Sequence, residues 1–144
     1  MEKSNLRSAF TLIEVLVVVA LVAILAAITF IAINPAKNFA DARNAQRSSD
    51  VAEILSAATQ YTATQGNTVA GLGTITVCPI QTVLGSGALD LTAPLVDGYI
   101  VGIPTDPSVG TAANTGYTIC KTATGRLTVT APSAENGKVI SVKR

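Results

Sequence analysis

The fold is decided by residues 9–33, which read AFTLIEVLVVVALVAILAAITFIAI. From Val15 to Ile33 the only polar residue is Thr29, and the run has about the length that a helix needs to cross the hydrocarbon core of a bilayer. Glu14 stands at the start of this run, where a charge is costly unless it finds a partner. The segment therefore predicts an apolar helix in which the Glu14 carboxylate has a positively charged partner. Identifying that partner would indicate what the helix does.

Composition argues against catalysis and against nucleic-acid binding. The 144 residues have room for one small domain beside a membrane segment, with 13% charged residues, a formal net charge of +1 and a mean hydropathy of +0.47. The absence of histidine removes the commonest general base and metal ligand. We expect no enzyme activity, cofactor, metal site or small-molecule substrate, and no direct nucleic-acid binding. The cluster of Lys138, Lys143 and Arg144 near the C-terminus is interpreted as a solvated strand terminus.

The segment after the apolar run is predicted to continue as one helix to about residue 64. Proline lacks the donor for a helical hydrogen bond, so Pro35 predicts a kink or a loosened turn within this helix. The continuation is amphipathic, and its apolar stripe consists of Val51, Ile54, Leu55, Ala58 and Tyr61. Its charged residues, Arg47 and Asp50 among them, are expected on the other faces.

The remainder of the chain reads as short strands separated by turn residues. Residues 74–78 and 99–101 are candidate strands, and three stronger runs follow in GYTICK, RLTVTA and KVISVK. The pair Asn136-Gly137 is a hairpin signal, so the last three runs predict an antiparallel meander covered by the apolar stripe. The predicted fold class is α+β, with a long N-terminal helix that packs by its second half on a small antiparallel sheet.

Two cysteines, Cys78 and Cys120, leave three readings open: one disulfide, two buried free thiols, or a reactive pair. The disulfide is favoured. It would close a loop of roughly 43 residues and contribute about 4 kcal/mol on the chain-entropy model. Since it would persist only in an oxidising compartment, it favours export of the domain.

The apolar run could also be a cleaved secretory signal or a plain signal anchor. A secretory signal has an apolar core of roughly 7–15 residues and ends in small residues, whereas this run is longer and ends in INPA. A signal anchor fits the length but leaves Glu14 and the amphipathic continuation unexplained. The positive residues on the two sides of the run balance each other and do not decide orientation.

The stretch AFTLIEVLVVVALVAILAAI resembles the N-terminal motif of type IV pilins and of the pseudopilins of type II secretion systems. In that family a short basic leader is cut immediately before a phenylalanine, which is followed by Thr-Leu-Ile-Glu and a long apolar helix. The resemblance implies cleavage between Ala9 and Phe10 by a prepilin peptidase, and N-methylation of Phe10. Ala9 stands where the family usually has glycine, and Pro35 falls a few residues later than the family's usual proline. The later IPTDP followed by GYTI resembles the pre-strand region of many bacterial pilins.

The resemblance also implies the domain organisation and the function. Residues 1–9 would be the leader, 10–33 the transmembrane and filament-core helix, 34–66 its amphipathic continuation, and 67–144 the pilin-like sheet region. The expected function is that of a structural subunit that assembles into a homo-oligomeric filament, with the inner-membrane assembly machinery as partner. The precursor would cross the bacterial cytoplasmic membrane once, and the filament would be extracellular or periplasmic. A secretion pseudopilin and a monomeric membrane-anchored binding domain are the alternatives.

Cleavage would supply the counter-charge of Glu14. Cutting after Ala9 creates an α-amino group on Phe10, which is mostly cationic at neutral pH. In an apolar filament core, Glu14 of one subunit and the Phe10 amine of its neighbour would satisfy each other, and the pair would select the stagger between subunits. The simpler interpretation is that Glu14 interacts with the free N–H groups and the dipole of its own helix start.

Overall fold

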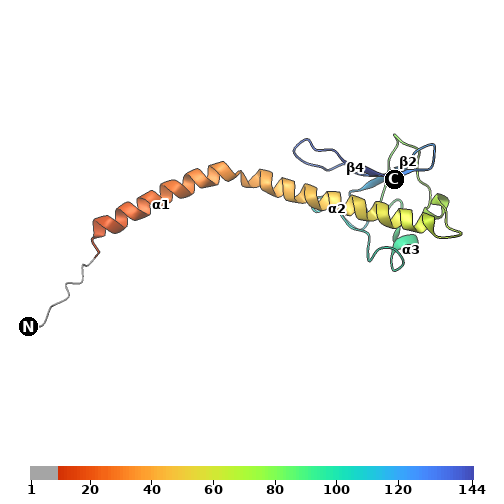
Figure 1. Ribbon diagram of the computed structural model, residues 1–144, viewed down its shortest axis with the longest axis horizontal. Helices are drawn as coiled ribbons and strands as arrows, with labels where there is room; N and C mark the ends of the chain where they lie inside the picture. The colour runs from red at the N-terminus through yellow and green to blue at the C-terminus, as the bar shows by residue number, and fades with distance from the viewer. Residues whose placement is uncertain (1–9) are drawn as a thin grey trace, which may run out of the picture. The chain divides into compact units, whose positions relative to one another are not determined.

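The computed structural model describes residues 10–144 (Figure 1), so the leader and Ala9 lie outside the described residues. Contacts divide the chain into two compact units, and the division falls between Asn38 and Phe39. The first unit carries an apolar helix and the second a helix packed on a sheet.

The N-terminal helix α1 (Leu12–Ile33) ends at Asn34, which adopts a left-handed conformation with φ of 44°. Helix α2 (Pro35–Ala63) begins at the next residue. The Asn34 side chain accepts a hydrogen bond from the Lys37 N–H at 3.3 Å, as an N-cap does, and Pro35 occupies the first helical position, where no N–H is needed. The expectation of one helix was therefore wrong, because the break at Asn34-Pro35 separates two independently capped helices.

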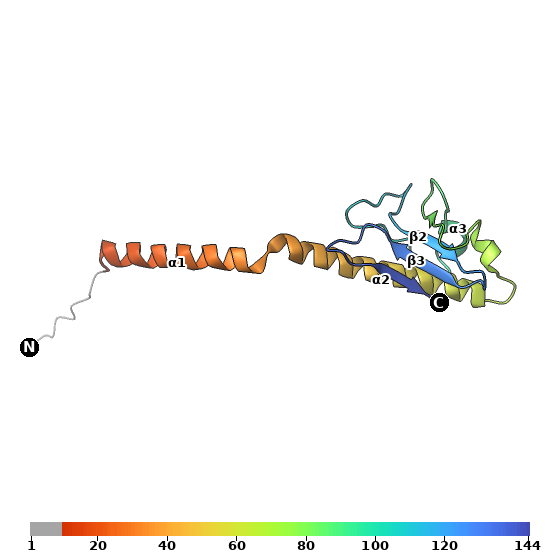
Figure 2. The ribbon, with the colours of Figure 1, turned by 90° about the horizontal axis from the view of Figure 1, so that it is seen from above.

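The second unit is a four-stranded antiparallel meander in the order β1-β2-β3-β4 (Figure 2). Its strands are β1 (Thr82–Val83), β2 (Thr118–Lys121), β3 (Leu127–Ala131) and β4 (Ile140–Lys143), with a 3₁₀ turn at Val69–Leu72 and the short helix α3 at Thr92–Leu95. Val129 lies opposite Ile119 on one side and Val142 on the other. The last three strands are those that the sequence predicts.

The predicted stripe of α2 forms the core against this sheet. Val51, Ile54 and Ala58 have no exposed surface, and Leu55 is 2% exposed. They cluster with buried sheet residues that include Ile119, Leu127 and Val129. Tyr61 is half-buried and makes an edge-to-face contact with Tyr99, with ring centroids 5.6 Å apart. The α+β class is confirmed.

Two weaker strand predictions were wrong. Residues 99–101 form a turn, and residues 74–78 are mostly irregular apart from an isolated bridge between Val77 and Lys121. The Cys78 N–H donates to the Lys121 carbonyl at 2.9 Å, and a disulfide joins Cys78 to Cys120, with Cα atoms 5.3 Å apart. One bridge and one disulfide thus hold this segment beside β2 without a full ladder of hydrogen bonds.

The expected placement of Arg47 on a solvent-facing side was also wrong. Arg47 has no exposed surface, and its guanidinium makes two hydrogen bonds to the Asp106 carboxylate, at 2.7 and 3.1 Å. It also donates to Glu135 at 2.8 Å and to the Ser108 hydroxyl at 2.7 Å. Asp50 is likewise buried and accepts a hydrogen bond from the Tyr117 hydroxyl at 2.6 Å. These charges connect the helix to segments far away in the sequence.

Glu135 belongs to the loop between β3 and β4, at residues 132–139, and binds this loop to α2. Its carboxylate receives two hydrogen bonds from Arg43, at 2.6 and 2.7 Å. Its backbone exchanges two more with the Asn44 side chain, at 2.9 and 3.0 Å. The predicted Asn136-Gly137 turn follows, with positive φ at both residues. The loop is longer than a two-residue hairpin because it extends to the helix before it turns.

This network shifts the pKa values of its carboxyl groups. Hydrogen bonds from Arg43 and Arg47 lower the pKa of Glu135 from 4.5 to about 2. Burial by itself raises the pKa of Asp106, but hydrogen bonds from Arg47 and from Ser108 outweigh it and hold the pKa well below its usual range. Both groups are therefore ionised in the folded domain over a wider range of pH than in the unfolded chain.

Replacing Cys78 by serine is expected to lower the free energy of unfolding of the sheet domain by about 2–4 kcal/mol, because the cross-link no longer restricts the unfolded chain. Denaturant titration of the full chain in detergent measures this change. Membrane insertion should be unaffected, since α1 makes no use of the disulfide. Equal stability of the wild-type chain before and after reduction would contradict the prediction.

Acid is expected to destabilise the domain. A carboxyl whose pKa is lowered on folding contributes stability above its ordinary pKa and loses it as the pH falls through the lowered value. For Glu135 this window runs from pH 4.5 to about 2. The free energy of unfolding should fall across it, and Glu135→Gln should be less stable at neutral pH and show a smaller loss in the window. A wild-type stability that is constant between neutral pH and about pH 3 would rule this out.

Candidate assembly surface

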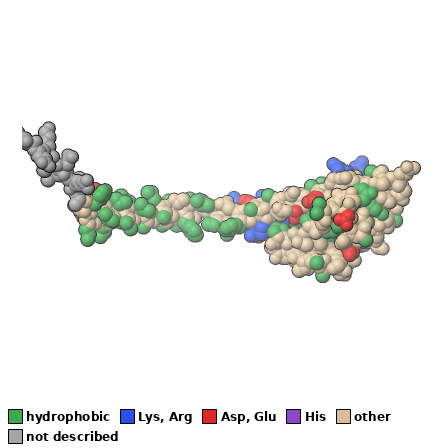
Figure 3. Space-filling view, turned by 90° about the horizontal axis from the view of Figure 1, so that it is seen from below, with side chains coloured by type: hydrophobic (Ala, Val, Ile, Leu, Met, Phe, Trp, Pro, Cys, Tyr) green, Lys and Arg blue, Asp and Glu red, His purple; other side chains and the backbone are tan. Residues whose placement is uncertain are grey.

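Helix α1 exposes apolar side chains on every side. None of its 22 residues is buried, and its mean hydropathy reaches 3.2 over an 18-residue window. Among its large hydrophobic residues, the exposed fraction runs from 48% at Val17 to 83% at Leu12. Figure 3 shows the same segment covered by hydrophobic side chains. At 1.5 Å per residue the helix is about 33 Å long, and within residues 10–144 it is the one helix long and apolar enough to cross a membrane.

Such a surface needs an apolar environment. Burial of one exposed valine, leucine or isoleucine contributes about 1.5–3 kcal/mol, so water is a poor solvent for this helix. Because α1 has no polar stripe, it cannot lie half-buried on a protein surface with one face in water. Lipid or a ring of other apolar helices can surround it.

The polar residues of α1 differ in how they are satisfied. The Thr29 hydroxyl donates to the Leu25 carbonyl at 2.7 Å, so Thr29 needs no external partner. Glu14 is exposed, and within the described residues its carboxylate makes no hydrogen bond or ion pair. A partner for Glu14 must therefore come from outside residues 10–144 of the same chain.

The N-terminal cap of α1 explains why the Glu14 carboxylate lies in the first turn of the helix. Thr11 is the N-cap of α1, and its hydroxyl accepts a hydrogen bond from the Glu14 N–H at 3.3 Å. Threonine followed three residues later by glutamate is the capping-box spacing, a signal that the sequence analysis missed. Glu14 therefore lies in the first turn, where the helix dipole favours a negative charge.

The remaining predicted site residues occupy separate places. Phe10 precedes the helix and is 79% exposed. Pro35 opens α2, and the disulfide of Cys78 and Cys120 lies in the sheet domain. Phe10, Thr11 and Glu14 thus lie near one another in the sequence, at the start of α1. The remaining predicted residues, Pro35 and the two cysteines, lie elsewhere in the fold and have structural roles.

The N-terminal segment matches a known family. Residues 4–30 match the prokaryotic N-terminal methylation motif, which is the prepilin-type leader of type IV pilins and pseudopilins. No curated protein and no solved structure matches the chain. The matched range includes Ala9, Phe10, Glu14 and most of α1. The resemblance seen in the sequence is therefore confirmed, and this chain carries the prepilin-type N-terminal segment of type IV pilins and pseudopilins.

Proposed function

We propose that this chain is the structural subunit of a type IV pilin-like filament. Prepilin peptidase cuts between Ala9 and Phe10, and the mature subunits assemble through α1. The observation that carries the proposal is the exposure of α1 on all sides, in a helix most of which lies within the methylation motif. A helix of this kind suits two environments, the bilayer before assembly and a bundle of identical helices afterwards.

The apolar side chains alone do not drive the passage from membrane to filament. Lipid tails are about as apolar as leucine, so the transfer of α1 from lipid to protein changes little hydrophobic free energy. A polar interaction that forms only in the filament would favour the transfer of α1 from the membrane to the filament. Glu14 and the new amine of Phe10 supply such an interaction, because each is costly alone and the two attract strongly in a medium of low dielectric constant.

The pair also selects one arrangement of subunits. The Glu14 carboxylate is in the first turn of α1 and the amine is four residues earlier in the chain. The amine of a neighbouring helix therefore comes level with this carboxylate only when that helix is shifted along its axis by the distance that separates the two groups within one chain. Other shifts leave both charges unpaired among apolar side chains, and they are disfavoured for that reason.

The break at Asn34 suits the same function. It ends the hydrogen-bond ladder of α1 before that of α2 begins, so α1 adjusts to its neighbours without disturbing the helix that forms the core of the domain. A secretion pseudopilin has the same N-terminal segment and differs in whether the fibre extends beyond the cell. A monomeric anchored domain would make no use of cleavage or of Glu14.

The mature protein is expected to begin at Phe10, with a methylated amine. Mass spectrometry of the N-terminal peptide, after expression of the chain with a prepilin peptidase, measures this directly. A chain expressed without the peptidase is the control and should keep Met1 to Ala9. Recovery of the uncut chain in both samples would favour the monomeric anchor.

Replacing Glu14 by valine is expected to abolish or strongly reduce filaments, because the amine of the neighbour is then unpaired in an apolar core. Insertion should be at least as good as in the wild type, since a charge has left the apolar segment. Glu14→Gln should be intermediate, because it keeps hydrogen bonding without charge. The measurement is the amount of the chain in sheared surface fibres relative to the membrane.

The sheet domain provides the control for this experiment, since its core residues do not depend on residue 14. Formation of the disulfide between Cys78 and Cys120 should be equal in the three chains. Normal fibre yield from Glu14→Val would exclude the pairing mechanism.

A further inference from the structure

The charges of the sheet domain are unevenly distributed. Three of its cations are paired: Arg43 with Glu135, Arg47 with Asp106 and Glu135, and Lys138 with Asp41. The other four, which we call the basic end, are Lys121, Arg126, Lys143 and Arg144. None of these four forms an ion pair with a residue of the described chain.

The register of the sheet brings the basic end together. Lys121 lies opposite Leu127, and the Arg144 backbone exchanges two hydrogen bonds with Leu127, both at 3.0 Å. Lys143 lies opposite Thr128, one residue further along β3. Arg126 directly precedes this strand. Four like charges at one end of the sheet repel one another, so an anionic partner stabilises them.

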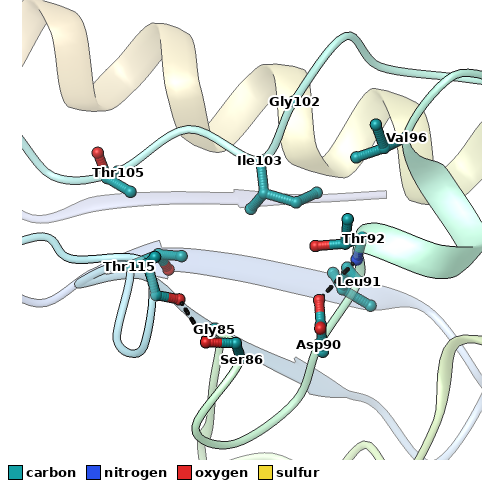
Figure 4. A pocket seen from close by; sticks show the side chains of 11 residues that line it. Gly85, Ser86, Asp90, Leu91, Thr92, Val96, Gly102, Ile103, Thr105 and Thr115 are labelled. Carbon is teal, nitrogen blue, oxygen red and sulfur yellow. Dashed lines mark hydrogen bonds between the residues drawn. The ribbon is translucent and has the colours of Figure 1, made fainter.

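The carboxylate of Asp90, which forms no ion pair within the described chain, lies in a groove elsewhere on the domain. The groove has a volume of about 310 Å³ and is lined by residues that include Ser86, Asp90, Leu91, Val96, Ile103 and Thr105. We call it the Asp90 groove. Val96, Ile103 and Thr105 line one side, and Asp90 and Ser86 line the other (Figure 4).

Asp90 is exposed in this groove and held in place. One oxygen of its carboxylate accepts a hydrogen bond from the Thr92 N–H at 2.8 Å, and no Lys or Arg of the described chain forms an ion pair with it. The groove thus combines an apolar wall with one anionic group. Its volume is at the small end of the range for ligand sites, roughly 300–1,000 Å³, which suits a long side chain better than a cofactor.

The two surfaces lie on different sides of the domain. Helix α3, which follows Asp90 closely in the chain, and the C-terminal end of β4 are on opposite sides of α2 in Figure 1. Two distinct surfaces that fit each other make a head-to-tail contact. Such a contact repeats without closing when the rotation between copies does not complete a ring, and it then builds a helical filament.

We propose that Lys143 of one subunit binds in the Asp90 groove of a second copy of this chain, with Arg144 beside the groove. The aliphatic part of the Lys143 side chain lies along Leu91, Val96 and Ile103, and its charge meets Asp90. Lys143 is suitable because it ends the edge strand β4, which has a neighbour on one side only, and Arg144 is the next residue, directed to the other face of the sheet. This inference rests on the filament proposed above and names a contact between its outer domains.

One such contact is weak, but its repetition along a filament affects the stability of the whole fibre. An exposed ion pair changes an association constant by about 1.5- to 5-fold, and complementary charges contribute more to specificity than to affinity. In a filament every subunit makes the contact twice, once with each surface. A loss at each step lowers the yield of long fibres.

The test uses the full-length chain in a bacterial host that supplies a prepilin peptidase and assembly machinery. Asp90→Asn is expected to lower fibre yield by about 1.5- to 5-fold. Asp97→Asn is the matched control, because Asp97 is also exposed and close to α3 but lies outside the groove. It should leave the yield unchanged.

A charge exchange makes the test specific. Lys143→Glu combined with Arg144→Glu should lower the yield more than Asp90→Asn, because like charges then meet at each contact. Adding Asp90→Lys to that pair restores the attraction with the signs reversed and should recover most of the yield. No recovery in the triple variant, together with a normal yield from Asp90→Asn, would overturn the inference.

Cross-linking gives a second measurement that does not depend on yield. Asp90→Cys combined with Lys143→Cys should give a ladder of disulfide-linked subunits in oxidised fibres, and Asp97→Cys with Lys143→Cys should give none. A lowered yield without a ladder would assign Asp90 to folding or to another partner and would also overturn the inference. Absence of fibres from the wild type would instead contradict the proposed function.

Discussion

The structure depends on one constraint, an apolar helix that its own chain does not cover. α1 has no buried residue, so its surroundings must come from lipid or from other apolar helices. Its capped start at Thr11 and its left-handed end at Asn34 make it a complete helix by itself. The hydrogen bonds and caps that stabilise α1 are therefore within the helix, whereas the apolar environment of its side chains comes from outside the chain. A subunit that is to leave the membrane for a filament needs a helix that stays intact when this environment changes.

In the proposed filament subunit, the sheet domain has the complementary requirement of remaining folded while the apolar helix changes environment. Its core is formed by α2, by strands β2 to β4 and by connecting segments that include Leu72, Leu84 and Leu95, and buried charges add to it. Arg47 links the helix to Asp106 and to Glu135, which belong to two separate loops. A buried ion pair contributes little net free energy compared with apolar packing, but it penalises arrangements in which the charges are apart. We infer that it holds both loops in one arrangement on α2.

The elements whose residues recur at a regular spacing could be predicted from the sequence. The features that depend on a single contact between distant residues could not. The stripe from Val51 to Tyr61 and the last three strands follow from spacing alone, and the methylation motif is local. Strand β1 has two residues, too few for a pattern. The burial of Arg47 could not be foreseen from α2, because a charge at that position looks solvated until Asp106, 59 residues away, is placed beside it. The pairing of Glu14 lies beyond one chain and stays a prediction.

Helical reconstruction of surface fibres by electron cryomicroscopy tests the central claim most directly. The account predicts fibres built from this chain, with residues 12–33 of neighbouring subunits packed together in the core and the sheet domains outside. It further predicts that each Glu14 carboxylate lies beside the Phe10 amine of a neighbouring subunit. A chain found only as single copies in the membrane, or fibres whose core contains no α1, would contradict it.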